Sequence, residues 1–361
     1  MYVISNFTGS IEGVTVCTLL DRARWGLLAY PLSVHNCKRY LQELNPDVVH
    51  IHYIGGSSLF APALRRLSYN FAIFATPWGS DVFRSGVFKR FLIRRLLTYT
   101  DRVLTTSPSM VSFLHYNFKI PNQKMASYSW GVDLKLFNSS SFSTKLLLRR
   151  ELGLPESGYV VFSNRVIAPV YRSEILLRAF QFARRHENDM HLVLLEGAPA
   201  TRQIELYRLH IKEMASSLGE SVTLIKGTIT PASMSAYLKS ADVVVGIPIS
   251  DQRSTSTLEA LACCPSVILS DVPAFRELRS EGYDFTLVYD VKEESVCKAL
   301  LLTRHESYEK RQKTLLHNNS LIQEQEDAQK QALKIEEEYY NILLSKSRLT
   351  KNTENLFPVV H

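Results

Sequence analysis

The sequence of 361 residues is poor in cysteine and contains no long apolar run. Its five cysteines have neither the paired spacing of zinc ligands nor the density of a disulfide framework, which favours a reducing compartment. The apolar run 243–249 is far shorter than the roughly 20 residues that a membrane-spanning helix needs. Residues 1–6 lack a basic stretch followed by an apolar core, so we expect no signal peptide and a cytoplasmic protein.

Composition and charge exclude little beyond this. A hydrophobic fraction of 45% and a charged fraction of 21% are typical of a soluble globular protein, not of a disordered or fibrous one. The length is sufficient for two domains, each with its own core. The net charge of +7 favours an anionic partner, such as a membrane surface, a phosphorylated ligand or nucleic acid, and it selects none of the three.

Apolar runs of strand length alternate with segments of helical periodicity almost throughout the chain. Most of these runs are continuous in Val, Ile and Leu, as in parallel strands that are covered on both faces. The predicted strands are 2–5, 14–19, 48–52, 71–76, 102–106, 159–163, 191–196, 222–226, 243–247 and 266–269. The predicted helices between them include 34–44, 173–185, 203–218 and 231–239. This order predicts an α/β fold of doubly wound layers.

The alternation stops once, over residues 128–157, where glycine, proline and a serine cluster predict an interdomain connection. We therefore place an amino-terminal domain at 1–150 and a carboxy-terminal domain at 151–345, followed by a tail at 346–361. Residues 294–345 are charged and helical, which predicts a pair of surface helices that pack back on the second domain.

The strongest candidate site follows the strand 243–247, where a polar loop opens a helix. Open α/β sheets bind ligands beyond the carboxyl ends of their strands. Backbone N–H groups at a helix start, beside small hydroxyl side chains, suit a phosphate. The hydroxyl residues are Ser254, Thr255, Ser256 and Thr257. Glu259 could accept hydrogen bonds from a ribose diol; the alternative is that Ser254 or Thr255 caps the helix and Glu259 complements its dipole.

Two arginines near the end of strand 159–163 are candidate cations for a diphosphate. Arg165 follows this strand directly, and Arg172 stands before the helix 173–185. An exposed arginine at a helix start is the alternative for Arg172. Gly197 ends the next strand, where a plain strand-to-helix turn is also an explanation.

The segment from Asp251 to Glu259 resembles the Asp/Glu-x7-Glu signature of glycosyltransferase family 4. Residues 131–137, Gly-Val-Asp-Leu-Lys-Leu-Phe, resemble the linker of that family. The resemblance implies the GT-B fold, in which two doubly wound domains face a cleft. It also implies that Glu259 binds the nucleotide ribose and that Asp251 lies near the donor sugar. Arg165 and Arg172 would then neutralise the diphosphate, Tyr171 standing where the family has a lysine, and Gly197 would belong to the family's Gly-Asp-Gly-Pro turn.

In the amino-terminal half, residues 76–81 resemble the His-Gly-Ser-Asp stretch near the reaction centre of the family, with Trp78 at the histidine position. The resemblance implies that Trp78, Gly79 and Ser80 line the cleft and that Asp81 or His52 orients the acceptor hydroxyl. His50 and His52 alternate along a strand, so we expect at most one of them to face the cleft. The family opens with a strand and a glycine-rich loop, whereas this chain is expected to begin at the second strand, 2–5, which puts full activity in question.

Residues 83–97 are basic and amphipathic, with arginine and lysine between Phe and Leu. This pattern suits the surface of an anionic membrane, which would be the inner face of the plasma membrane. The alternative is a helix that packs on its sheet and exposes a basic face.

Together these features predict a retaining glycosyltransferase that uses a UDP- or GDP-sugar and a lipid-linked or oligosaccharide acceptor, in polysaccharide or lipopolysaccharide synthesis. The sequence has no Asp-x-Asp motif that would recruit a divalent metal, so we expect no metal and no cofactor besides the donor. We also expect no nucleic acid partner. Three alternatives stay open: a catalytically impaired GT-B protein, a sugar-nucleotide epimerase, and a non-catalytic module that binds anionic surfaces.

Overall fold

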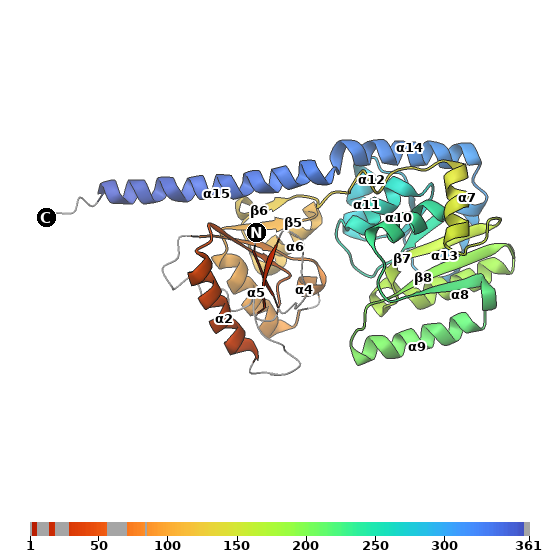
Figure 1. Cartoon of the computed structure of the whole chain (residues 1–361), viewed down its shortest axis with the longest axis horizontal. Coiled ribbons are helices and arrows are strands. Elements are labelled where there is room, and N and C mark those ends of the chain that lie inside the picture. Colours follow the sequence, from red (N-terminus) through yellow and green to blue (C-terminus); the bar gives the residue numbers. More distant parts are fainter. Residues whose placement is uncertain (1, 6–13, 19–28, 56–70, 84, 357–361) are drawn as a thin grey trace. The chain divides into compact units, whose positions relative to one another are not determined.

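The computed structural model describes residues 2–5, 14–18, 29–55, 71–83 and 85–356. The chain divides into two compact units (Figure 1). Unit 1 comprises the described parts of residues 1–128 and 334–361, and unit 2 comprises residues 129–333. Of the predicted segments, Leu19, Arg84 and residues 357–361 lie outside the described residues.

Unit 1 contains a four-stranded parallel sheet in the order β3-β4-β5-β6 and a separate parallel pair, β1 and β2. Its strands are β1 (Tyr2–Ser5), β2 (Thr15–Thr18), β3 (Val48–His52), β4 (Ala72–Thr76), β5 (Arg102–Thr105) and β6 (Met125–Ser127). Its helices before residue 128 are α2 (Ala29–Leu44), α4 (Ser80–Phe83), α5 (Val87–Tyr99) and α6 (Pro108–Phe118), followed by the single turn η4 (Asn122–Lys124). The first five strands agree with the prediction, and β6 was missed because three residues are too few for a periodic pattern.

Unit 2 is built on a six-stranded parallel sheet in the order β12-β11-β10-β7-β8-β9. Its strands are β7 (Tyr159–Val166), β8 (Met190–Gly197), β9 (Val222–Lys226), β10 (Val243–Gly246), β11 (Val267–Ser270) and β12 (Thr286–Val288). Its helices are α7 (Phe142–Glu151), α8 (Ser173–Arg184), α9 (Arg202–Ser216), α10 (Pro231–Ser240), α11 (Thr255–Cys263), α12 (Pro273–Ser280), α13 (Glu293–Arg304) and α14 (Tyr308–Gln325), with short turns η5 (Pro169–Tyr171) and η6 (Gly219–Ser221).

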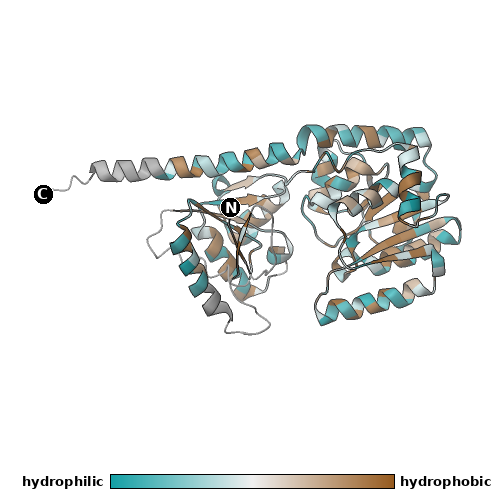
Figure 2. Cartoon of the chain, in the orientation of Figure 1, coloured by the Kyte–Doolittle hydropathy of each residue, from teal (hydrophilic) through white to brown (hydrophobic). Residues whose placement is uncertain are grey.

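Both faces of the unit 2 sheet are covered, which explains why its central strands are continuously apolar. Val160 and Phe162 of β7 point into one core, with residues of α10, α11, α12 and α14. Tyr159 and Val161 point into the other, with residues of α8, α9 and α13. Figure 1 shows these helices on either side of the sheet, and Figure 2 shows the strands between them as mostly hydrophobic. The predicted doubly wound α/β fold is confirmed.

The boundary between the units falls at Ser129, earlier than the predicted position near residue 150. The Val132 N–H donates to the Glu326 carbonyl at 2.6 Å, so the linker is already bonded to unit 2. The serine-rich segment that was expected to be a connection contains α7, because Ser141 accepts a hydrogen bond from the Thr144 N–H and caps this helix. Its basic residues Lys145 and Arg149 pair with Asp242, which directly precedes β10.

The carboxy-terminal segment also differs from the predicted pair of helices and tail. Three helices follow one another, α13, α14 and the long α15 (Ala328–Leu356). From Lys334 onward α15 belongs to unit 1, where Glu338 pairs with Arg102 and Lys346 pairs with Asp101. Among the described residues, no helix combines the length and the apolar character that crossing a bilayer requires.

Candidate functional site

The carboxyl ends of β7 and β10 form the switch point of the unit 2 sheet. These two strands are neighbours, but the chain continues from β7 to β8 and β9 on one side and from β10 to β11 and β12 on the other. Connections that leave in opposite directions open a crevice at the strand ends, where ligands bind in open α/β sheets. Arg165 lies near the end of β7, and the loop with Asp251 follows β10.

Arg165 gathers the predicted residues of the loop around its guanidinium. The guanidinium forms an ion pair with the Asp251 carboxylate and donates to the Ser254 hydroxyl at 2.5 Å. It also lies 5.2 Å from the ring centroid of Tyr171, the residue at the family's lysine position. The Ser254 and Thr257 hydroxyl oxygens are 2.9 Å apart. One cation is thus held at the switch point by an acid, a hydroxyl and an aromatic face.

The amino end of α11 faces the same cluster. Ser254 is the N-cap residue, but its side chain makes no capping hydrogen bond to the helix in the described structure, because its hydroxyl is used by Arg165 and Asp251. The alternative that Ser254 merely caps this helix is therefore wrong. The Asn164 side chain donates to the Ser256 carbonyl at 2.6 Å and fixes the helix start against β7. Sequence reasoning missed Asn164, although a polar residue at the buried end of an apolar strand is a usable signal.

Glu259 is half-buried on the second turn of α11. Burial raises the pKa of its carboxyl group to about 7, and the nearby charge of Arg165 opposes this shift. The helix dipole acts mainly within the first turn, so complementing it is a weak explanation for this residue. A carboxyl group with a displaced pKa beside a strand switch point is typical of a ligand site.

Arg172 and Gly197 shape the loops around this cluster. Arg172 precedes α8 with a left-handed φ of 51°, and its guanidinium donates to the carbonyls of Ile247 and Pro248 at 3.3 and 2.9 Å. It therefore braces the loop after β10, and the alternative of an exposed arginine is wrong. Gly197 has a φ of +87°, and a Cβ there would lie 2.8 Å from Val166 and 2.9 Å from the Arg208 guanidinium, so only glycine fits.

Arg208 is a second residue that sequence reasoning missed. It is buried on α9, and its guanidinium donates to the Ala198 carbonyl at 2.7 Å, directly after β8. Arg208, Ile211 and Ala215 are the buried residues of this helix. A basic residue in register with an apolar stripe at helical spacing was the available signal.

In unit 1, the Asp81 carboxylate bonds to the backbone and does not face a substrate. The residue is fully buried, and its carboxylate accepts the N–H groups of Ile54 at 2.6 Å and of Trp78 at 3.0 Å. The prediction that Asp81 orients an acceptor hydroxyl is therefore corrected. By contrast, the neighbouring Trp78 is 48% exposed. Gly79 has a φ of +102°, and Ser80 begins α4.

His50 and His52 lie on the same face of β3, with ring centroids 4.1 Å apart. The reasoning that alternation along the strand separates the two rings was wrong, because residues two apart on a strand share a face. Both ring nitrogens of His50 are engaged, one with the Tyr339 hydroxyl at 2.5 Å and one with the Thr76 hydroxyl at 2.8 Å. Burial, aided by His52, lowers the pKa of His50 to about 3, so this ring stays neutral. His52 remains the histidine candidate of this unit, and burial lowers its pKa as well.

Two family models match consecutive parts of the chain. Residues 8–136 match the model of Glycosyltransferase Family 4, and residues 157–306 match that of Glycosyl transferases group 1. The chain belongs to the group 1 glycosyltransferases. This membership agrees with the predicted resemblance, and the second model includes Arg165, Asp251 and Glu259.

The curated relatives of this chain have different named activities, and each matches only about half of it. It is 30% identical to the D-inositol 3-phosphate glycosyltransferase of Salinispora arenicola over 49% of this chain and 41% of the relative. It is 25% identical to the alpha-monoglucosyldiacylglycerol synthase of Streptococcus pneumoniae over 55% of this chain and 44% of the relative. The chain thus spans less than half the length of these curated relatives.

Two solved structures resemble most of the chain. The sucrose-phosphate synthase of Thermosynechococcus elongatus has a TM-score of 0.77 at 19% identity, covering 91% of this chain and 84% of the other. HepE of Anabaena in complex with UDP-glucose has a TM-score of 0.73 at 14% identity, covering 91% and 86%. At such identities the likeness concerns the fold alone, and it agrees with the predicted GT-B architecture.

Proposed function

We propose that this chain transfers a sugar from a nucleoside diphosphate sugar to an acceptor hydroxyl, with retention of configuration. The observation that carries the proposal is the convergence of Arg165, Asp251 and Ser254 at the switch point, with Glu259 on α11, the helix that Ser254 precedes. A diphosphate needs a cation and N–H donors, and a ribose diol needs an acceptor carboxylate. These groups are present together in unit 2.

In the proposed mechanism the main contribution is electrostatic. Negative charge grows on the diphosphate as the bond to the sugar breaks, and Arg165 with the amino end of α11 stabilises that charge. Glu259 accepts hydrogen bonds from the ribose, and Asp251 lies beside the sugar. Arg172 positions the loop. No divalent metal has a step in this scheme.

The donor is proposed to be UDP-glucose or a related UDP- or GDP-sugar. HepE, which shares the fold, was solved with UDP and with UDP-glucose, and this supports a uridine nucleotide. The names of the relatives refer to D-inositol 3-phosphate, to alpha-monoglucosyldiacylglycerol and to alpha-maltose 1-phosphate, so the relatives support more than one acceptor class. We keep a lipid-linked or oligosaccharide acceptor in surface polysaccharide synthesis as the proposal, because α5 provides a surface suited to lipid.

Calorimetry with UDP, GDP and their glucose conjugates tests the proposed donor site. We expect at least one of them to bind with a Kd below about 1 mM. Glu259→Gln should weaken this binding about tenfold or more, because a hydrogen bond to a charged group contributes about 1.5–3 kcal/mol. Glu213→Gln, on the exposed surface of α9, is the control and should bind as the wild type does. Failure of all four ligands would contradict the proposal.

The raised pKa of Glu259 adds a pH test to the same variants. The ionised carboxylate accepts both ribose hydroxyls, so affinity should rise between pH 6 and pH 8, around the pKa of about 7. The phosphate of the ligand also titrates, and it does so in the same way with wild type and with Glu259→Gln. The test therefore uses only the difference in affinity between the two proteins at each pH. Because the pKa is raised in the folded state, the stability of the wild type falls as the pH rises from the unfolded pKa of about 4.3 to the folded pKa of about 7. The loss is complete at pH 8, where Glu259→Gln should be the more stable protein.

The proposed contact with an anionic membrane rests on the start of α5. Val87, Phe88 and Phe91 are 88%, 76% and 60% exposed, whereas Ile93, Leu96 and Leu97 are buried in the unit 1 core. The helix therefore packs on its sheet, as the alternative expected, and still presents apolar side chains to solvent. The same helix carries the basic residues Lys89, Arg90, Arg94 and Arg95, and all but the half-buried Lys89 are exposed. Such a surface suits the headgroup region of an anionic bilayer.

Vesicle sedimentation measures this contact. Wild type should bind vesicles with one third phosphatidylglycerol more tightly than pure phosphatidylcholine, since each basic residue near an anionic surface contributes about 1 kcal/mol. The double variant Phe88→Ser/Phe91→Ser should bind at least tenfold more weakly because it loses the buried apolar area. Tyr116→Ser removes an equally exposed ring from α6 and should change nothing. Equal binding to both kinds of vesicle would refute the contact.

A further inference from the structure

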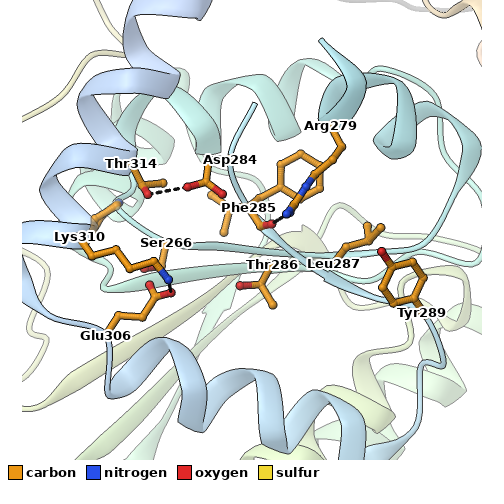
Figure 3. Close-up of a pocket in the computed structure, with 12 residues that line it drawn as sticks. Ser266, Arg279, Asp284, Phe285, Thr286, Leu287, Tyr289, Glu306, Lys310 and Thr314 are labelled. Carbon is orange, nitrogen blue, oxygen red and sulfur yellow. Dashed lines mark hydrogen bonds and ion pairs between the residues drawn. The ribbon is translucent and has the colours of Figure 1, made fainter. Parts of the chain in front are cut away.

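A pocket of about 300 Å³ lies along the edge strand β12 and the amino end of β11 (Figure 3). In the sheet order, β11 and β10 separate β12 from β7, which carries Arg165. The pocket is therefore distinct from the proposed donor site. A volume of this size is at the lower end of the range for ligand pockets, so it suits a small ring and not a whole nucleotide sugar.

The charged side chains of the lining neutralise one another. Lys310 forms an ion pair with Glu306, and the Asp284 carboxylate accepts the Thr314 hydroxyl at 2.9 Å. Arg279 donates to the Phe285 carbonyl, and its guanidinium lies 5.6 Å from the centroid of the Phe285 ring. With two cations and two anions the lining has no net formal charge. Such a lining does not select an anion or a cation, and it favours an uncharged ligand.

Hydroxyl groups supply the directional contacts. Ser266, Thr286, Thr314 and Tyr289 all line the pocket. A hydroxyl donates one hydrogen bond and accepts two, which complements a ligand that itself consists of hydroxyls. Ser266 is 4% exposed, and its hydroxyl has no hydrogen-bond partner in the described structure. An unpaired buried hydroxyl costs free energy, so its presence requires an explanation.

An apolar ring face completes the lining. Tyr289 is 77% exposed and follows β12, and Figure 3 shows it across Thr286 from the pairs Glu306–Lys310 and Asp284–Thr314. An exposed aromatic ring offers a flat apolar face with a polar tip. Sugar rings combine C–H faces with hydroxyl edges, and this pocket combines an aromatic face with paired carboxylates and hydroxyls. The strand β12 has three residues, which is too short for pairing with an extended peptide.

We propose that this pocket is a second binding site, which takes one uncharged sugar residue of a glycan. The site goes beyond the proposed transfer reaction and does not depend on it. A glycan held there would be retained by unit 2 independently of the nucleotide.

Saturation-transfer NMR on the full chain tests the pocket, with the methyl glycosides of glucose, galactose, mannose and N-acetylglucosamine as probes. We expect a signal from at least one probe at millimolar concentration. Thr286→Val removes a lining hydroxyl with little change of shape, and Tyr289→Ala alters an exposed side chain that the fold does not need. Each should reduce the signal at least fivefold and leave UDP binding unchanged.

Glu259→Gln serves as the opposite control, because it should weaken UDP binding and leave the glycoside signal intact. The proposal is overturned if no glycoside binds, or if Glu259→Gln removes the signal and both pocket variants keep it. It is also overturned if inorganic phosphate, and no glycoside, responds to the pocket variants. If the wild type does not bind UDP, the proposed donor site is contradicted, and the proposal for the pocket is unaffected.

Discussion

Arg165→Met is expected to lower the rate of sugar release from UDP-glucose by about 10²–10³-fold, the usual cost of removing one donor that stabilises developing charge. The substitution removes the cation and also leaves Asp251 without its ion-pair partner. The remaining carboxylate then repels the diphosphate. The measurement is donor hydrolysis with water as the acceptor, so it does not require the natural acceptor.

A double-mutant cycle separates these two effects. Arg165→Met/Asp251→Asn should recover part of the affinity for UDP that Arg165→Met loses, because the uncompensated charge is gone, but it should recover little of the rate. Arg178→Met is the matched control. It removes an arginine of α8 that is 43% exposed and paired with Glu174 within the same helix. Equal rates in Arg165→Met and Arg178→Met would contradict the proposed mechanism.

Asp242→Ala is expected to destabilise unit 2 by about 3–5 kcal/mol, as when one partner of a buried ion pair is removed. Asp242 accepts hydrogen bonds from Lys145 at 2.5 Å, from Arg149 at 2.6 Å and from the Val160 N–H at 2.7 Å. Without the carboxylate, Arg149 remains buried with an uncompensated charge. The measurement is hydrogen exchange of peptides from β7 and β10 in the full chain.

The effect of Asp242 depends on pH in a defined direction. Burial alone would raise the pKa of this carboxyl group, but Lys145 and Arg149 outweigh burial and the pKa lies below its ordinary value. A carboxyl group whose pKa is lowered by folding stabilises the protein at every pH above its unfolded pKa of about 3.9. This stabilisation is lost as the pH falls through the pKa of the folded state. The difference between wild type and Asp242→Ala should therefore be full at pH 7 and shrink below about pH 4. Glu156→Ala, which breaks the exposed pair with Arg150, should alter exchange little at either pH. A similar effect from both variants would contradict this account.

The sequence predicted the elements that carry their own periodic signal. The strands around Val161, Leu194 and Val244 are continuously apolar because both of their faces are covered, so their pattern survives without knowledge of the neighbours. The helix start before Glu259 was predictable for a similar reason, since a polar loop follows a buried strand and precedes an apolar stripe. Arg165 was found because it stands at the end of such a strand.

Features that depend on a distant partner could not be predicted. Arg172 turns inward because the carbonyls of Ile247 and Pro248 accept its guanidinium, and these carbonyls are some 75 residues away in sequence. Asp81 is buried because the Ile54 N–H, 27 residues earlier, requires an acceptor. Local pattern gives the chemistry of a side chain but not the direction in which it points.

The long helix α15 has a consequence for the order in which this protein matures. Unit 2 is one continuous stretch, whereas unit 1 receives Glu338, Tyr339 and Lys346 from a segment that is synthesised after the whole of unit 2. On the ribosome, domains generally fold as units as they emerge. Unit 2 can therefore complete its sheet before α15 has been synthesised. Unit 1 can form its bonds from His50, Arg102 and Asp101 only after that helix is present. Unit 1 is thus the first unit to be synthesised and the last to complete its folding.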